Sequence, residues 1–335
     1  EPENGIPYMS VSWPGMIGVV SGMNKEGVTV TINAGKSKIP MTAKTPISFV
    51  TREILQYAKN IDEAVEIAKK RKVFVSESIL VGSANDKKAV IIEVSPKNFG
   101  VYDVVNSSKV LCTNHFQSEA YKNDKRNQKH ILESHSEYRY EKLQELLQTN
   151  KMLNPEKMAS ILRDQSGLKD KNIGYGNEKA INQLLAHHAV IFSPETRLVW
   201  VSSSPYQLGE FVCYDLNEIF SDQRLKDSDF SKQELNIAKD SFLDSRAFED
   251  YEEFKKLSSR FEENKFLSDE FIEHYQSLNP DFWLVYYQAG KYYFKQKEYS
   301  KARFEFEKAL TKEITTVPDR ENVEKYLKKT LRKLK

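Results

Sequence analysis

Two asparagines end apolar, β-branched runs of the sequence, where their carboxamides could bind a carbonyl oxygen. Residues 28–33 alternate apolar and polar side chains, which is the period of a strand with one buried face, and the run ends at Asn33. Residues 109–113 form a second short extended run, which ends at Asn114. Because amide N–H groups aimed at a developing oxyanion are a common device of acyl transfer, we expect both asparagines to serve that chemistry. The alternative for each is an ordinary turn-forming asparagine.

The motifs around these asparagines resemble one group of N-terminal-nucleophile hydrolases. Pro14-Gly15, Gly18 and the run from Gly22 to Gly27 resemble the group's PG…G…GMNExGL…N signature, which ends at Asn33. Residues 113–116 match its TNHF element. The group includes acyl-coenzyme A:6-aminopenicillanate acyltransferase, N-acylethanolamine acid amidase, acid ceramidase and, more distantly, the choloylglycine hydrolases.

The resemblance continues in order over roughly residues 8 to 220 of the chain. It includes residues 46–64, the hairpin 78–96, an SxxR element at 136–139 and a last hairpin at 193–201. It implies a four-layer αββα sandwich of two antiparallel sheets between helices. The order of predicted elements, with helix pairs between series of strands, fits that α+β fold as well.

One departure from the family concerns the nucleophile. The family uses a cysteine that self-cleavage makes N-terminal, followed by a GRNxD-like stretch, whereas this chain starts at Glu1 and its Cys112 and Cys213 are internal. We therefore expect this chain to be the larger part of an autoprocessed amidase or acyltransferase, associated with a shorter polypeptide that carries the cysteine. The alternative is an inactive scaffold or binding protein of the same fold.

The resemblance also implies roles for individual residues. Asn33 and Asn114 would donate to the oxyanion, and Arg139 of the SxxR element would orient the site through bidentate hydrogen bonds. The alternative for Arg139 is a surface arginine paired with Glu137 or Glu141. The substrate would be a small N-acyl compound with a linear C–N amide bond.

Three apolar side chains near the motifs would suit the acyl chain of such a substrate, although residues of these types are also ordinary core formers. They are Trp13, Met16 and Phe116. Cys112 is expected to be a structural thiol in an apolar run, and we assign no dyad between it and His115.

Composition excludes several classes of protein. The 335 residues carry 50 basic and 48 acidic side chains, a net charge of +2, which does not favour a nucleic-acid partner. Two cysteines and six histidines show no metal-ligand spacing, so neither a metal nor another cofactor is expected. No apolar run approaches the length of a transmembrane helix. The resemblance favours a secreted or periplasmic location, which the residues themselves leave open.

Element by element, hydrophobic periodicity predicts the first 220 residues as follows. Residues 1–9 are a loop, and strands at 16–21 and 28–33 form a hairpin about residues 24–27. A loop at 36–46 borders the site, the segment 121–129 is a solvated loop, and 168–182 is a surface loop over the site. The remaining elements are helices at 47–57, 61–70, 137–149 and 155–163, and strands at 77–84, 88–94, 98–105, 109–113, 188–192, 198–203 and 210–214.

From about residue 221 to 335 the sequence has no strand pattern and predicts helices throughout. Six of its residues fall on the spacing of one tetratricopeptide repeat, at about 279–318: Tyr286, Gly290, Tyr293, Ala302, Phe306 and Ala309. Because a solenoid usually needs at least three repeats, this helical extension is expected to dock on the catalytic domain, on a protein partner or on a second copy. The alternative is an appendage without a binding role.

Overall fold

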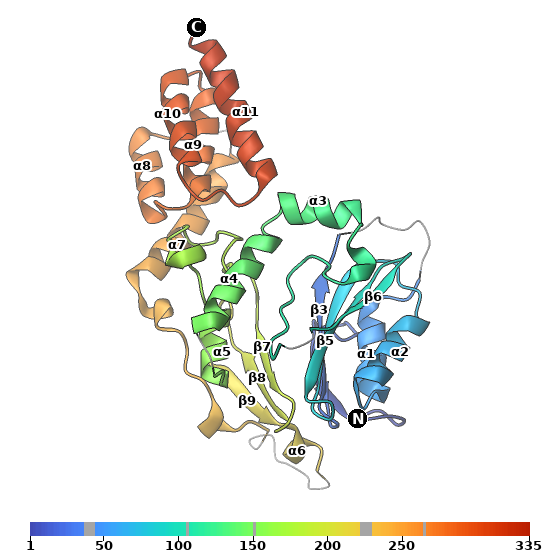
Figure 1. Cartoon of the computed structure of the whole chain (residues 1–335). Helices are drawn as coiled ribbons and strands as arrows, with labels where there is room; N and C mark the ends of the chain where they lie inside the picture. Colours follow the sequence, from blue (N-terminus) through green and yellow to red (C-terminus); the bar gives the residue numbers. More distant parts are fainter. Residues whose placement is uncertain (37–43, 105–106, 150–151, 222–229, 264–265) are drawn as a thin grey trace.

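The computed structural model describes residues 1–36, 44–104, 107–149, 152–221, 230–263 and 266–335. Within them, two antiparallel sheets stand face to face, with helices on the outer side of each (Figure 1). The first sheet runs in sequence order through β1 (Tyr8–Val11), β2 (Ser21–Asn24), β3 (Val28–Ala34), β4 (Glu77–Ser83), β5 (Lys88–Val94) and β6 (Phe99–Tyr102). The second contains β7 (Val190–Ser193), β8 (Leu198–Ser202) and β9 (Phe211–Asp215). The predicted four-layer αββα sandwich is confirmed.

Two helices cover the outer face of the first sheet. They are α1 (Ile47–Tyr57) and α2 (Ile61–Lys70), with the bounds that the sequence predicts. Asn60 caps α2 by accepting from the backbone N–H of Glu63, and Lys69-Lys70 complement the dipole at its other end. Apolar side chains of alternate strand positions, among them Val28 and Val30, are buried with the apolar faces of both helices.

The turn between β2 and β3 ties this hairpin to α1. Asn24 is fully buried, and its Nδ2 donates to the carbonyls of Leu55 and Ala58 while its Oδ1 accepts from Val28 N–H. Gly27 has φ +76°, a conformation that a residue with a side chain rarely adopts. The predicted turn is therefore confirmed, whereas its first strand is residues 21–24 instead of 16–21, and residues 8–11 are a strand where the sequence predicts a loop.

The second sheet carries α5 (Pro155–Leu162) on its outer face, and α4 (Ser136–Thr149) precedes it (Figure 1). Ala159 of α5 is buried with Trp200 and Phe211 of the sheet. The two sheets meet through a separate apolar cluster in which Met23 of the first contacts Val199 of the second. The short α6 (Leu216–Ile219) follows β9.

Residues 121–129, predicted as a solvated loop, instead contain most of α3 (Lys125–Glu133). Asp124 caps this helix by accepting from the backbone N–H groups of Arg126 and Asn127. The prediction was wrong because α3 is mostly charged and polar and buries only Asn127, so too few apolar side chains mark it as a helix. The helix lies across the end of the sandwich that faces the helical extension, beside α11 (Val317–Lys333) (Figure 1).

The helical extension contains α7 (Arg246–Ser258), α8 (Asp269–Leu278), α9 (Trp283–Lys295), α10 (Tyr299–Leu310) and α11 (Val317–Lys333). The pair α9 and α10 forms the hairpin that the repeat spacing predicts, and a Cβ on Gly290 would lie 2.6 Å from the ring of Phe306. A small residue is therefore needed where the two helices approach. The comparisons described below do not confirm a tetratricopeptide relationship. None of the described helices is both long and apolar enough to cross a bilayer.

The helical extension packs on the sandwich through a shared apolar cluster. Leu184 and Leu208 are fully buried with side chains of α7 to α11. The side chain of Asn279 bonds the backbone of Tyr175 in both directions, and Glu313 accepts from Lys171 Nζ at 2.9 Å and from Lys179 Nζ at 2.6 Å. The loop at 171–184 is thus held between the two parts of the chain.

Candidate active site

Asn33 projects from the face of the first sheet that looks away from α1 and α2. It pairs across the sheet with Ser78, which in turn pairs with Glu93, so the three side chains form a row on one face. Asn33 Nδ2 donates to Cys112 Sγ at 3.3 Å. The strand end therefore presents its carboxamide to the segment that contains the second predicted asparagine.

The segment that carries Asn114 is irregular, and the predicted strand at 109–113 is wrong. Its backbone is held by side chains: Gln117 Nε2 donates to the Leu111 carbonyl at 2.8 Å. Glu93, which is fully buried, accepts from the N–H groups of Gln117 at 2.5 Å and Ser118 at 3.0 Å and from Ser118 Oγ at 2.6 Å. Burial raises the pKa of the Glu93 carboxyl, against the effect of these hydrogen bonds. This one side chain anchors the segment to the sheet.

Asn114 lies at the point where β3, the irregular segment and α4 meet. Its backbone N–H donates to Ser136 Oγ at 2.8 Å, and its Nδ2 donates to the Ala34 carbonyl at 3.1 Å. Arg139 Nη2 donates to Asn114 Oδ1 at 2.6 Å. The structure thus brings Asn33, Asn114 and Arg139 together from distant parts of the sequence.

Arg139 is held by a chain of polar contacts that leads away from Asn114. Its Nε donates to His135 Nδ1 at 3.2 Å, and His135 Nε2 lies 3.1 Å from Glu178 Oε2. Burial lowers the pKa of Arg139, and the hydrogen bond from His135 lowers the pKa of Glu178. Arg139 therefore uses two separate acceptors instead of one bidentate partner. The Glu137 carboxylate lies 3.5 Å from His115 Nε2, and Glu137 is not one of these two acceptors of Arg139.

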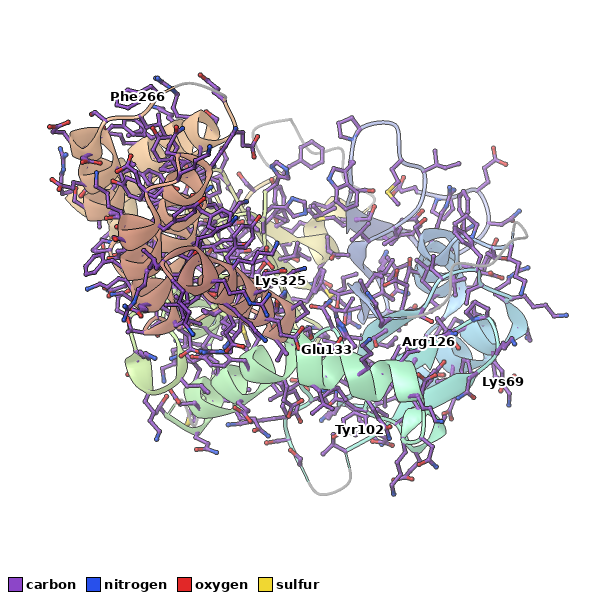
Figure 2. All side chains as sticks on the ribbon, turned by 90° about the horizontal axis from the view of Figure 1, so that it is seen from above. Lys69, Tyr102, Arg126, Glu133, Phe266 and Lys325 are labelled. Atoms are coloured by element: carbon purple, nitrogen blue, oxygen red, sulfur yellow. The ribbon has the colours of Figure 1, made fainter. Side chains whose placement is uncertain are left out.

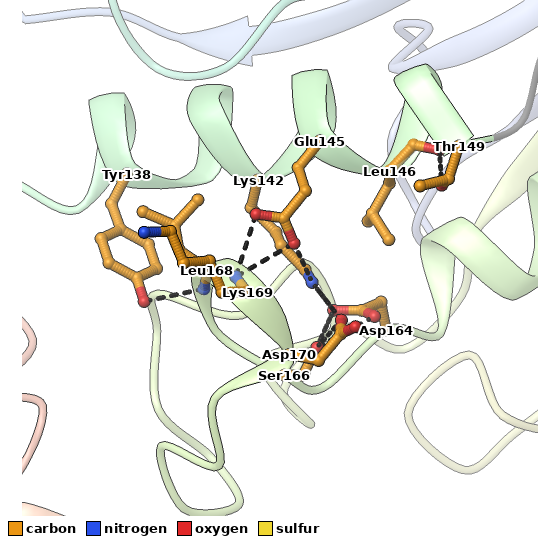
Figure 3. A network of polar contacts seen from close by, with 10 residues as sticks. All are labelled: Tyr138, Lys142, Glu145, Leu146, Thr149, Asp164, Ser166, Leu168, Lys169 and Asp170. Atoms are coloured by element: carbon orange, nitrogen blue, oxygen red, sulfur yellow. Dashed lines mark hydrogen bonds and ion pairs between the residues drawn. The ribbon is translucent and has the colours of Figure 1, made fainter.

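Next to Arg139, a polar network fixes α4 against the loop that follows α5 (Figure 3). Lys142 is fully buried, and its Nζ lies 3.0 Å from Asp170, 3.2 Å from Glu145 and 3.8 Å from Asp164. Tyr138 accepts from the backbone N–H of Leu168 at 3.0 Å. A buried ammonium group needs such partners, and together they pin the helix that presents Arg139.

His115 is engaged in hydrogen bonds with its neighbours. Its Nδ1 lies 2.9 Å from Ser136 Oγ and 3.1 Å from Thr113 Oγ1. Burial, assisted by His130 and Arg139, lowers the pKa of His115 to about 4, so its contact with Glu137 at 3.5 Å is not an ion pair at neutral pH. The ring orders the segment around Asn114 as a neutral group.

Neither cysteine of the chain is a ready nucleophile. Burial raises the pKa of the Cys112 thiol to about 12, against the opposing effect of the Asn33 hydrogen bond. Cys213 is fully buried in the core of the second sheet, where burial raises its pKa to about 11. Since the thiolate is the reactive form, both side chains are poor nucleophiles at neutral pH.

The three residues predicted to bind the acyl chain lie in different environments. Trp13 is 53% and Met16 37% exposed. Both residues lie in the loop that connects Val11 to Ser21. Because Ser21 pairs with Thr31, this loop leaves the sheet at the end where Asn33 lies. Phe116 is only 4% exposed, packs against the tilted ring of Tyr121 and contacts Gly35 closely. Most of the predicted loop at 36–46 falls in residues 37–43, outside the described residues.

Three residues of the site were missed by sequence reasoning, namely Glu93, His135 and Glu178, while Ser136 was identified only as the first residue of the SxxR element. A glutamate among the apolar residues that follow Lys88 in β5 was a usable signal for Glu93, because a buried carboxylate requires several donors. The partnership of His135 with Glu178 spans distant segments and leaves no local pattern. Among the described residues, no group of three or more metal-ligating side chains is placed to hold a metal ion.

Comparisons with known proteins identify relatives of this chain. The model of the family described as acyl-coenzyme A:6-aminopenicillanic acid acyl-transferase matches residues 2–204. An uncharacterized protein of Archaeoglobus fulgidus is 31% identical over 108 residues, which span 30% of this chain and 17% of that protein.

Similar solved structures include a variant of the conjugated bile acid hydrolase of Clostridium perfringens, with 10% identity and a TM-score of 0.36 over 62% of this chain and 76% of that one. Another is the Caenorhabditis elegans ortholog of N-acylethanolamine-hydrolyzing acid amidase, with 16% identity and a TM-score of 0.34 over 61% and 81% of the two chains. Because the family model covers more than half of the residues, this chain belongs to the acyl-coenzyme A:6-aminopenicillanic acid acyl-transferase family.

Proposed function

We propose that this chain forms the oxyanion site of an N-terminal-cysteine amidase or N-acyltransferase that acts on linear C–N amide bonds of N-acyl substrates. The observation that carries the proposal is the convergence of Asn33, Asn114 and Arg139 in a chain of this family. Asn114 is only half-buried, so a substrate carbonyl can reach it.

The carboxamide of Asn114 suits the role of oxyanion donor. An amide NH₂ group has two hydrogens, and the Ala34 carbonyl accepts one of them. The second can donate to the oxygen on which negative charge develops when a nucleophile attacks the amide carbon. Asn33 Nδ2 has the same capacity beyond its bond to Cys112.

In this proposal the nucleophile is the thiol of a cysteine on a separate, shorter segment. Support comes from the two cysteines of this chain, whose pKa values are raised to about 12 and about 11. The free α-amino group of an N-terminal cysteine has a pKa near neutrality and can take the thiol proton. The acyl group then passes to sulfur and the amine leaves with a proton; water or a second amine takes the acyl group.

Intact mass and turnover of the native protein test this proposal together. We expect a second, shorter species that begins with cysteine, and trapping with a linear N-acyl amide should add the acyl mass to that species. Alkylation of its cysteine should abolish turnover. A protein that hydrolyses amides as this chain alone would contradict the proposal, and a native complex without any amide turnover would favour a non-catalytic scaffold.

A further inference from the structure

Glu178 ends a series of hydrogen bonds that begins at Asn114. Arg139 Nη2 donates to Asn114 Oδ1 at 2.6 Å, and Arg139 Nε donates to His135 Nδ1 at 3.2 Å. On the other side of the imidazole ring, His135 Nε2 lies 3.1 Å from Glu178 Oε2. The series therefore joins the candidate oxyanion donor to the loop at 171–184.

The direction of each bond in this series follows from the groups that make it. A guanidinium group has no acceptor, so His135 Nδ1 must be unprotonated where Arg139 donates to it. The ring proton is then on Nε2, which donates to the Glu178 carboxylate. This hydrogen bond is the main cause that lowers the pKa of Glu178. Without Glu178 the ring could turn, and Arg139 would lose one of its two acceptors.

Both sequence neighbours of Glu178 are bound to the helical extension. Asn177 is fully buried, and its Nδ2 donates to the Glu313 carbonyl at 2.9 Å. Thr315 Oγ1 donates to Asn177 Oδ1 at 3.2 Å, and Lys179 Nζ donates to the Glu313 carboxylate at 2.6 Å. The segment between α10 and α11 therefore holds the backbone on both sides of Glu178.

The helical extension also meets the sandwich close to His135. Because α3 ends at Glu133 and α4 begins at Ser136, His135 lies in the junction between the two helices. α11 contacts α3, and Figures 1 and 2 both show α11 near the end of α3 that carries Glu133. The extension thus borders both segments that supply the outer half of the series.

We propose that Glu178 is a positioning residue for amide turnover: through His135 and Arg139 it directs the Asn114 carboxamide at the oxyanion, and the helical extension holds it in place. The inference rests on the proposed function, in which Asn114 is the donor. The Glu178 side chain is 47% exposed, and a pair so open to solvent adds little to the stability of the fold. Its loss should therefore affect kcat and leave the melting temperature nearly unchanged.

Turnover of the assembled enzyme by two variants tests this role. Glu178→Ala should lower kcat about fivefold with little change in KM, because the series acts through the direction in which Asn114 donates. Glutamine keeps an oxygen that can accept from His135 Nε2, so Glu178→Gln should retain at least about half of the wild-type kcat. Equal losses in the two variants, or no loss in either, would overturn the proposal.

A double variant separates positioning from a general loss of structure. In Arg139→Ala the series is already interrupted between Glu178 and Asn114. Arg139→Ala combined with Glu178→Ala should therefore turn over no more slowly than Arg139→Ala. A further loss of about fivefold in the double variant would show that Glu178 acts by another route and would contradict the proposal.

Glu313→Ala tests the part played by the helical extension. It removes the carboxylate that accepts from Lys179, so kcat should fall about threefold and the loop at 171–184 should exchange its amide hydrogens faster. Glu307→Ala is the matched control, because Glu307 is exposed on α10 and pairs within its own helix. Unchanged turnover in Glu313→Ala, or the same loss in Glu307→Ala, would contradict a role for the extension.

Nitrogen NMR of the histidine rings tests the geometry without any turnover. At neutral pH the His135 ring, assigned through His135→Gln, should carry its proton on Nε2 alone. That proton should exchange slowly with water in the wild type and in Glu178→Gln, and rapidly in Glu178→Ala. A proton on Nδ1 in an enzyme that turns over amides would contradict the positioning role alone. The expected ring geometry in a native complex without amide turnover would contradict the proposed function, so the two can fail separately.

Discussion

The guanidinium of Arg139 donates from Nη2 to Oδ1 of Asn114 over 2.6 Å. Because a guanidinium group has no acceptor, this bond decides which end of the Asn114 carboxamide faces α4. The NH₂ end must then point toward the end of β3, where it bonds the Ala34 carbonyl. Arg139 therefore acts as a positioning residue: it sets the direction in which Asn114 donates.

Replacing Arg139 by alanine should lower kcat by about tenfold or more, because the freed carboxamide can rotate and lose its orientation toward the oxyanion. KM should change little if the contact matters only in the transition state. Guanidinium ion at low millimolar concentration should restore part of the turnover, which a merely destabilised fold would not show. Arg320→Ala, at an exposed position on α11, is the matched control. Unchanged turnover in Arg139→Ala would refute the positioning role.

Cys112→Ala should keep most of the activity of the assembled enzyme. The thiol receives a hydrogen bond from Asn33, but with a pKa of about 12 it is not a thiolate at neutral pH. Iodoacetamide should likewise label Cys112 slowly in the folded protein and rapidly after denaturation. Complete loss of turnover in a folded Cys112→Ala variant would show that the nucleophile lies in this chain.

Glu305→Gln should stabilise the helical extension at alkaline pH. Glu305 is 7% exposed on α10, and burial raises its pKa to about 7. A carboxyl group whose pKa is higher in the folded than in the unfolded protein binds its proton more tightly in the folded state. It therefore contributes stability that is fully present below its unfolded pKa and is lost as the pH rises through its folded pKa of about 7. The amide introduced by Glu305→Gln would keep an acceptor for Gln276, which now donates to Glu305 at 2.7 Å.

Thermal unfolding at pH 4 and pH 8 measures this effect. The variant should gain up to about 3 kcal/mol at pH 8, from 1.36 kcal/mol per pKa unit, and almost nothing at pH 4. Glu321→Gln, an exposed carboxylate on α11, controls for the change in net charge. The same gain at both values of pH would mean that burial of the Glu305 charge is not its cause.

Local patterns predicted the elements that local forces determine. The helices at 47–57 and 61–70 have strong apolar periodicity, the second also has a capping residue, and their bounds agree with the structure. The prediction of a strand at 109–113 failed because β-branched residues form a strand only where a neighbouring strand can pair with them. In the structure, side chains such as Gln117 bond this backbone instead.

For the site, the resemblance to a known family supplied Asn33, Asn114 and Arg139 as candidates, and the structure brings them together. It could not supply the contacts that orient them. Glu178 reaches His135 from a loop that the helical extension holds through Glu313, and such a contact depends on tertiary packing alone. No spacing within the sequence indicates it.

The turnover number of Asn114→Ala in the assembled enzyme tests the central claim most directly. If the carboxamide of Asn114 donates to the oxyanion, kcat per folded molecule should fall on the order of a hundredfold or more, about 3 kcal/mol of transition-state stabilisation. A turn-forming asparagine would lose roughly 1 kcal/mol of stability and nothing in turnover. A destabilised Asn114→Ala variant with normal kcat would contradict the account.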